Sequence, residues 1–313
     1  MTDTHLLVFG PGYSARAVMA RARAAGWRIS ATARTTDKAE ALADMGVTPI
    51  PFQAGTPFAP PKQPVTHVLA SLAPSADRSA EDPVLAQAET WLRGEETLVW
   101  AGYLSSTNIY GDHDGAWVDE TTPPAPTLDR GLDRLRAETA WRRLAGPGRV
   151  VDVFRLAGIY GPGRNAARSL RLGRARRVIK PGQVFSRIHV DDIGDAVMRA
   201  MGQALAFSKP PGGLETDGAR LFNLADDMPA PPQDLITQAA HWMGITPPPE
   251  QDFDTADLPP MAASFYADCK RVQNRRAKDI LGWQPLWPDW QSGLKPLAAA
   301  EKAVLAMGRH GGA

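Results

Sequence analysis

The chain has 313 residues, of which 43% are hydrophobic, and its formal net charge is +1. This length and apolar content are enough for a large α/β core, alone or with a smaller lobe. The near-neutral charge provides no field that would draw the protein to nucleic acid or to a membrane, and the one cysteine, Cys269, excludes a disulfide within the chain.

Targeting and metal-binding patterns are also missing from the sequence. The N-terminus runs straight into an apolar strand-like segment, without the basic and apolar regions of a secretory signal. No apolar stretch is long enough to cross a bilayer, and the six histidines are scattered without ligand spacing. We therefore expect a cytoplasmic protein without a metal site.

Strand-like and helical segments alternate along the first half of the chain. Helices are predicted at 15–25, 84–92 and 233–243. Apolar runs predict six strands, at residues 6–9, 27–33, 47–52, 67–71, 97–104 and 150–154. This alternation indicates an α/β fold with a doubly wound parallel sheet of the Rossmann type, whose ligand lies at the carboxyl ends of the strands.

Proline-rich segments divide the rest of the chain. Those at 51–64, 121–126 and 209–213 predict surface loops. We expect residues 1–227 to form the nucleotide-binding domain, with 166–187 contributing to the substrate lobe. Residues 228–313 then form mainly this smaller C-terminal substrate-binding lobe and a final helix.

A glycine loop follows the first predicted strand. It reads Gly10-Pro11-Gly12-Tyr13-Ser14-Ala15 and leads directly into a helix, which is the context of a dinucleotide site. Gly10 permits the tight turn, Gly12 leaves room for a pyrophosphate, and Ala15 allows close packing of helix on strand. The helix N-terminus offers unpaired N–H groups to the phosphates. An ordinary strand–helix turn is the alternative.

The end of the second predicted strand indicates which dinucleotide binds. Chains that select NAD usually place an acidic residue there, to bond the ribose 2′-hydroxyl. Here Arg34 and Thr35 follow the strand instead, and a guanidinium suits a phosphate. This favours NADP(H) over NAD(H). In the alternative, Arg34 stacks on adenine or faces solvent, and Asp37 meets the ribose.

Four further segments resemble motifs of one known superfamily. Ser-Ser-Thr-Asn-Ile-Tyr-Gly stands at 105–111, and Phe-Arg-Leu-Ala-Gly-Ile-Tyr-Gly-Pro-Gly at 154–163. Arg-Ile-His-Val-Asp-Asp-Ile follows at 187–193, and Leu-Gly-Trp-Gln-Pro at 281–285. Together with the glycine loop, and in this order, they resemble the extended short-chain dehydrogenase/reductase superfamily in its epimerase/dehydratase-like branch.

The resemblance implies site residues at matching positions. Ser106 matches a hydroxyl that bonds the reacting oxygen. The segment Ser71, Leu72 and Ala73 matches the ribose and nicotinamide side of the cofactor, and Ala157, Gly158 and Ile159 match the loop that lines the nicotinamide ring. These two segments form the predicted cofactor site with Gly10, Gly12, Tyr13, Ser14, Ala15, Arg34, Thr35 and Arg134, and Ser106 is a predicted catalytic residue.

The superfamily's Tyr-x-x-x-Lys pair is replaced in this chain. Its place on the helix after the fifth strand is taken by Arg130 and Arg134. Arg134 still has the charge and donors to bind ribose hydroxyls. Arg130 stays protonated and cannot exchange a proton, so it is predicted to be an electrostatic clamp for an anionic substrate. Tyr110 or Tyr103 would then supply the acid.

Two functions follow from this replacement. The first is an NAD(P)-dependent oxidoreductase or epimerase/dehydratase-like enzyme acting on a small polar substrate, with an anionic, nucleotide-sugar-like compound as one candidate. The second is a non-catalytic dinucleotide-binding redox sensor or scaffold. Six arginines between 164 and 177 form either a solvated face or a rim that attracts an anion. Because members of this superfamily often pair through helices beside the active site, a homodimer is also expected.

Overall fold

The computed structural model describes residues 4–53, 55–74, 82–206 and 218–310. The predicted loop at 209–213 lies outside these ranges, as do the chain's last residues, 311–313.

A seven-stranded parallel sheet forms the centre of the molecule, in the order β11-β7-β5-β4-β1-β2-β3. The prediction of a doubly wound α/β fold is confirmed. Its strands are β1 (His5–Phe9), β2 (Arg28–Ala33), β3 (Thr48–Pro51), β4 (His67–Ala70), β5 (Trp100–Ser106), β7 (Val150–Leu156) and β11 (Ala219–Leu224).

Three strands differ clearly from the sequence prediction: β11 was missed, and β5 and β7 each run two residues past their predicted ends. β11 was not predicted, because Arg220 and Asn223 interrupt its apolar run, yet both are fully buried. Arg220 is tolerated there because it pairs with Asp152 of β7 at 2.6 Å. β5 continues two residues past its predicted end, through the polar Ser105 and Ser106.

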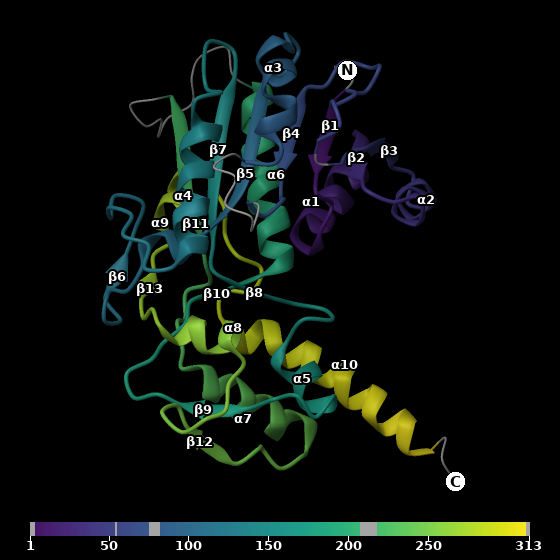
Figure 1. Cartoon of the computed structure of the whole chain (residues 1–313). Coiled ribbons are helices and arrows are strands. Elements are labelled where there is room, and N and C mark those ends of the chain that lie inside the picture. Colours follow the sequence, from purple (N-terminus) through teal and green to yellow (C-terminus); the bar gives the residue numbers. More distant parts are fainter. Residues whose placement is uncertain (1–3, 54, 75–81, 207–217, 311–313) are drawn as a thin grey trace.

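Helices cover both faces of the sheet (Figure 1). Helices α1 (Tyr13–Ala24) and α6 (Val190–Ala206) pack on one face, and α3 (Leu85–Gly94) and α4 (Asp129–Arg142) lie on the other. α2 (Thr36–Asp44) lies beside the edge strand β3. A separate apolar core lies under each layer, so the sheet is buried on both sides, as a parallel sheet requires.

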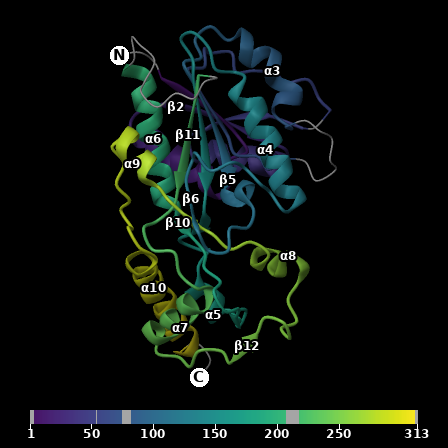
Figure 2. The same ribbon diagram turned by 90° about the vertical axis from the view of Figure 1, so that its left-hand side faces the viewer.

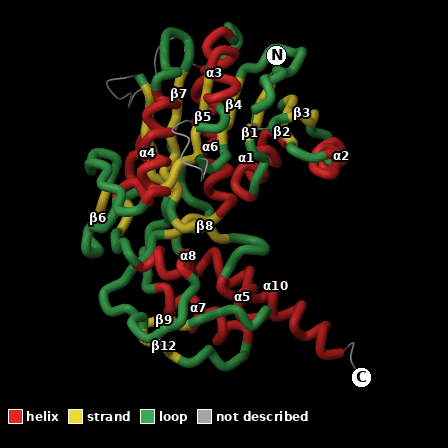
Figure 3. Tube along the Cα trace, in the orientation of Figure 1, coloured by secondary structure: helices red, strands yellow, loops and turns green. Residues whose placement is uncertain are grey.

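A smaller lobe of helices and loops lies below the sheet (Figure 3). Helices α5 (Ala166–Arg171), α7 (Pro232–Met243) and α10 (Trp290–His310) pack around their own apolar core. A short parallel pair, β9 (Arg177–Ile179) and β12 (Glu250–Asp252), adjoins α7. The domain boundaries stay predictions.

Short elements join the two parts or line their junction. α9 (Arg275–Leu281) packs back onto α6 and β11. The others are η1 (Thr107–Tyr110), β6 (Trp117–Val118), β8 (Gly158–Tyr160), β10 (Arg187–His189), α8 (Pro260–Ala263), η2 (Ser264–Tyr266) and β13 (Arg271–Val272).

A buried ion pair fixes α4 against the sheet. Arg155 of β7 donates to Glu138 of α4 at 2.9 Å, and both side chains are at most 2% exposed. Ser105 of β5 donates to the same carboxylate at 2.5 Å. These bonds set how α4 lies over the carboxyl end of β5.

A buried carboxyl group with one oxygen unbonded by any described residue lies where the sheet and the lobe meet. Asp226 is 1% exposed, and its Oδ1 accepts the Met228 N–H at 3.2 Å. No described group bonds to its other oxygen. Burial raises the pKa of Asp226 to about 8, although the nearby Arg187 guanidinium opposes this shift.

Replacing Glu138 tests the buried pair. Glu138→Gln leaves the Arg155 charge buried without its partner, which should lower the free energy of unfolding by about 3–5 kcal/mol in urea titrations. The control is Glu89→Gln, because Glu89 pairs with Arg93 at 2.7 Å with both side chains nearly half exposed. It should cost less than about 1 kcal/mol. Equal losses of unfolding free energy in both variants would contradict the structural role of the Glu138–Arg155 pair.

Asp226 should make stability depend on pH. An acid whose folded pKa lies above its unfolded value of 3.8 holds a proton in the folded state that the unfolded chain has released. Stability is therefore lost as pH rises from about 4 towards about 8. Asp226→Asn should remove this pH-dependent loss of stability. The free energy of unfolding of the variant should therefore increase relative to that of the wild type as pH rises. Parallel profiles of unfolding free energy against pH for the two proteins would rule out this effect of Asp226.

Candidate functional site

The carboxyl ends of the sheet strands face the lobe (Figure 1). The segments after β1, β4, β5 and β7 meet along this edge. They carry nearly all of the residues predicted for the site, and Arg34 and Thr35 follow the neighbouring strand β2.

The glycine loop after β1 has the shape that a phosphate requires. Gly10 has φ +75°, its N–H donates to Thr32 Oγ1 at 2.9 Å, and a Cβ there would lie 2.6 Å from Leu72. A Cβ on Gly12 would meet nothing closer than the Gly10 carbonyl at 3.9 Å. Gly12 is the N-cap of α1 and has ordinary backbone angles. The space before the helix N-terminus is therefore open, while Ala15 is fully buried against the core.

The segment after β4 lies beside this loop. The Ser71 N–H donates to the Phe9 carbonyl at 2.9 Å, and Leu72 packs against Gly10. Ala73 is exposed. The predicted ribose-side segment and the glycine loop are thus neighbours.

The loop after β7 reaches the glycine loop from the lobe side. The Ala157 N–H donates to Leu224 and the Gly158 N–H to Ser186, which places Gly158 and Ile159 in the short sheet with β10. Tyr13 donates to the Pro162 carbonyl at 2.9 Å. Burial raises the pKa of Tyr13, partly opposed by Arg164. Ser14, next to Tyr13, is buried.

The end of β2 is exposed and basic. Arg34 follows the strand and is exposed. Thr35 is the N-cap of α2 and accepts the Lys38 N–H at 3.4 Å. This arrangement leaves the Arg34 side chain accessible to a ligand at the strand end.

The two arginines of α4 lie one turn apart and have different partners. Arg134 donates to the Leu104 carbonyl at 2.8 Å and to the Tyr103 hydroxyl at 3.1 Å, both on β5. Arg130 reaches past the strand end and donates to Ser264 Oγ at 2.7 Å. Ser106 lies at this strand end, and its hydroxyl oxygen accepts the Asn108 N–H at 3.2 Å.

All five tyrosines are among the described residues, and none occupies the place of the missing phenol. Tyr110 is fully buried, bonded to Asn223 at 2.8 Å and to Arg155 at 3.0 Å, and burial raises its pKa to about 12. Tyr103 is also fully buried, and burial raises its pKa. Neither hydroxyl reaches the open edge, so the structure gives no support to either as the acid.

Several residues at this edge were not predicted. Met261, Ser264 and Phe265 contact Arg130 from far along the chain, and no local pattern marks them. Lys270 is 9% exposed and donates to the Gly111 carbonyl at 2.7 Å. These contacts are tertiary and could be found only from the fold.

The arginine-rich stretch mostly has partners within the lobe. Arg168 and Arg171 pair with Glu301, and Arg177 pairs with Glu250. Arg176 donates to the Asp257 carbonyl. These bonds favour a structural role for four of the six arginines over an anion-attracting rim.

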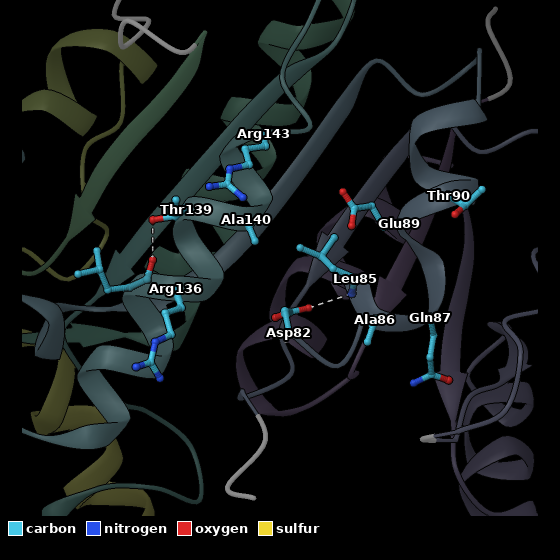
Figure 4. Close-up of a pocket in the computed structure, with 11 residues that line it drawn as sticks. Asp82, Leu85, Ala86, Gln87, Glu89, Thr90, Arg136, Thr139, Ala140 and Arg143 are labelled. Carbon is cyan, nitrogen blue, oxygen red and sulfur yellow. Dashed lines mark hydrogen bonds between the residues drawn. The ribbon is translucent and has the colours of Figure 1, made fainter. Parts of the chain in front are cut away.

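A groove of about 670 Å³ lies away from this edge, between α3 and α4 (Figure 4). Leu85, Gln87 and Glu89 line one side, and Arg136, Thr139 and Arg143 line the other. No predicted site residue lines it.

In the described part of the chain no three His, Cys, Asp or Glu side chains gather to hold a metal. Within the same residues, no helix is both long and apolar enough to span a membrane.

Comparisons with known proteins identify relatives of this chain. No family model matches it. It is 45% identical to a conserved protein of unknown function from Silicibacter pomeroyi, whose solved structure it matches with TM-score 0.83 over 95% of this chain and 99% of that one. It is 29% identical to a 3-diazoavenalumate denitrifying reductase of Streptomyces over 64% of this chain and 62% of that protein. The chain thus spans less than two thirds of this curated relative.

A more distant solved structure shares the fold. Human epimerase family protein SDR39U1, solved with NADPH, is 17% identical and matches 95% of this chain and 99% of that one with TM-score 0.66. Five motifs in order, the doubly wound sheet and these likenesses agree. The chain belongs to the family of the Silicibacter pomeroyi protein, and its fold is that of epimerase/dehydratase-like proteins.

Proposed function

We propose that the chain binds NADP(H) at the glycine loop and acts as an NAD(P)-dependent oxidoreductase or epimerase-like enzyme on a small anionic substrate. The observation that carries this proposal is the open space before α1, where a Cβ on Gly12 would meet no atom closer than 3.9 Å. A helix N-terminus facing open space at the carboxyl edge of a parallel sheet suits a diphosphate.

The residues around this space fit the cofactor. Arg34 would hold the 2′-phosphate of NADP(H), and no acidic side chain stands at the end of β2 to repel it. Ser71, Leu72 and Ala73 would lie along the ribose and Ala157, Gly158 and Ile159 along the nicotinamide. The Streptomyces relative is named as a reductase, and SDR39U1 was solved with NADPH.

The chemistry assigned to α4 is electrostatic. When bound, the nicotinamide supplies or accepts a hydride. The fixed charge of Arg130 would hold an anionic group of the substrate, and Ser106 could donate its hydroxyl proton in a hydrogen bond to the reacting oxygen. Arg134, held by Leu104 and Tyr103, would face the ribose. Arg130 does not exchange protons, so another group must supply the proton.

A non-catalytic redox sensor is the second candidate, and the burial of Tyr103 and Tyr110 favours it. A sensor needs different affinities for oxidised and reduced cofactor, whereas an enzyme turns substrate over. Calorimetry with NADP⁺ and NADPH, together with a nicotinamide absorbance assay on carbonyl and sugar-nucleotide substrates, separates the two. Turnover with any substrate excludes the sensor, while equal affinities without turnover count against both.

Cellular location and assembly also remain proposals. The single cysteine fits a reducing, cytoplasmic compartment. Pairing through the α3–α4 groove would give a homodimer. A mass of 33.7 kDa by light scattering in solution would exclude that dimer.

Gly12→Val tests the phosphate cradle. The backbone at Gly12 accepts any residue and the space beside it is open, so the variant should fold with a melting temperature close to that of the wild type. The valine would occupy the place of the diphosphate, and NADPH affinity by calorimetry should fall about tenfold or more. Gly94→Val is the matched control, because a Cβ on Gly94 likewise has open space around it and meets nothing within 4 Å. Unchanged affinity in Gly12→Val would refute the cradle.

Arg34→Gln tests the choice of cofactor. It removes the fork that would bind the 2′-phosphate, so NADPH affinity should fall by about 10- to 100-fold. NADH lacks that phosphate and serves as the internal control, with its affinity nearly unchanged. If both affinities fall together, Arg34 stacks on the adenine and the preference for NADP(H) is wrong.

A further inference from the structure

The segment that contacts Arg130 is anchored to the lobe. It consists of α8 and η2, residues 260–266, and Figure 2 shows α8 below α4. Tyr266, at its end, is 9% exposed and lies edge-on to Phe185 with ring centroids 5.4 Å apart. Lys180 donates to the Tyr266 carbonyl at 2.5 Å. The segment is therefore held in place.

Two apolar side chains of this anchored segment stay exposed. Met261 is 65% exposed and Phe265 is 50% exposed. The Arg130 guanidinium stacks over the Phe265 ring at 4.7 Å and donates to the Met261 sulfur at 3.3 Å. An exposed ring and thioether beside a cation, at the edge where the substrate would bind, form a surface with both apolar and charged character.

The bonds of Arg130 leave one edge of its guanidinium poorly satisfied. Nη1 donates to Ser264 Oγ at 2.7 Å, whereas Nη2 makes only a long bond of 3.3 Å to the Ser264 carbonyl. Nε is buried and has no acceptor among the described residues. All of these partners are neutral, and residues 258–266 contain no charged side chain. Nη2, whose bond is long, is the donor of this guanidinium that is left for a ligand carboxylate oxygen.

We infer that Arg130, Met261 and Phe265 form a subsite for an aromatic carboxylate, which names the substrate class of the proposed enzyme and rests on that proposed function. The carboxylate accepts a hydrogen bond from Nη2 of Arg130, and the aromatic ring lies against Phe265 and Met261. Ser264 positions the guanidinium through Nη1. A nucleotide sugar has no ring–carboxylate unit of this kind and is not the expected ligand.

Three small probes separate charge from ring in calorimetric titrations, run with and without excess NADP⁺. They are 3-phenylpropionate, its amide 3-phenylpropionamide, and butyrate. The wild type should bind 3-phenylpropionate about tenfold or more tightly than either of the others. This comparison needs no variant, so misfolding cannot obscure it.

Single-residue variants show which side chains produce the preference for 3-phenylpropionate. Arg130→Gln should abolish the difference between the acid and its amide, and Phe265→Ala should abolish most of the difference between 3-phenylpropionate and butyrate. Arg136→Gln, on the same helix, and Met307→Ala, a 73% exposed side chain on α10, are matched controls and should change neither. NADPH affinity should be the same in all four variants.

The outcomes distinguish the two proposals. If the wild type binds NADPH but does not prefer 3-phenylpropionate, or if Arg130→Gln keeps the preference, the subsite is overturned and the proposed function stands. If the wild type binds no NADPH, the proposed function fails, and the substrate assignment fails with it.

Discussion

The reversal of strand order beside β1 is the constraint on which the candidate site depends. From β1 the sheet grows through β2 and β3 on one side, and through β4, β5, β7 and β11 on the other. The helices that follow β1 and β4, α1 and α3, consequently pack on opposite faces of the sheet. The two connections diverge at the carboxyl edge, and a crevice at such a point is where open α/β sheets bind their ligands.

The second constraint is the position of α4 over β5. Glu138 binds Arg155 and Ser105, so the helix is tied to two strands by buried polar bonds. One helix face then presents Arg134 to the end of β5 and Arg130 to the lobe. In this chain that helix face carries two permanent charges where the resemblance would place a proton-exchanging pair.

The sequence predicts those parts of the structure that local pattern encodes. The glycine loop, the parallel sheet and the place of Ser71 at the end of the fourth predicted strand follow from apolar runs and glycine positions. β11 could not be predicted in this way, because its buried Arg220 is stable only through Asp152, a residue 68 positions away. The partners of Arg130 on α8 and η2 are more than 130 positions away and are set by how the lobe packs.

The central claim is that the space before α1 holds the diphosphate of a nicotinamide cofactor. Calorimetric titration of ligand-free protein with NADPH tests it most directly. One-to-one binding with micromolar or tighter affinity, competed by NADP⁺, is the result that the account predicts. Absence of heat with NADPH, NADP⁺, NADH and NAD⁺ alike, from protein that is folded by circular dichroism, would contradict it.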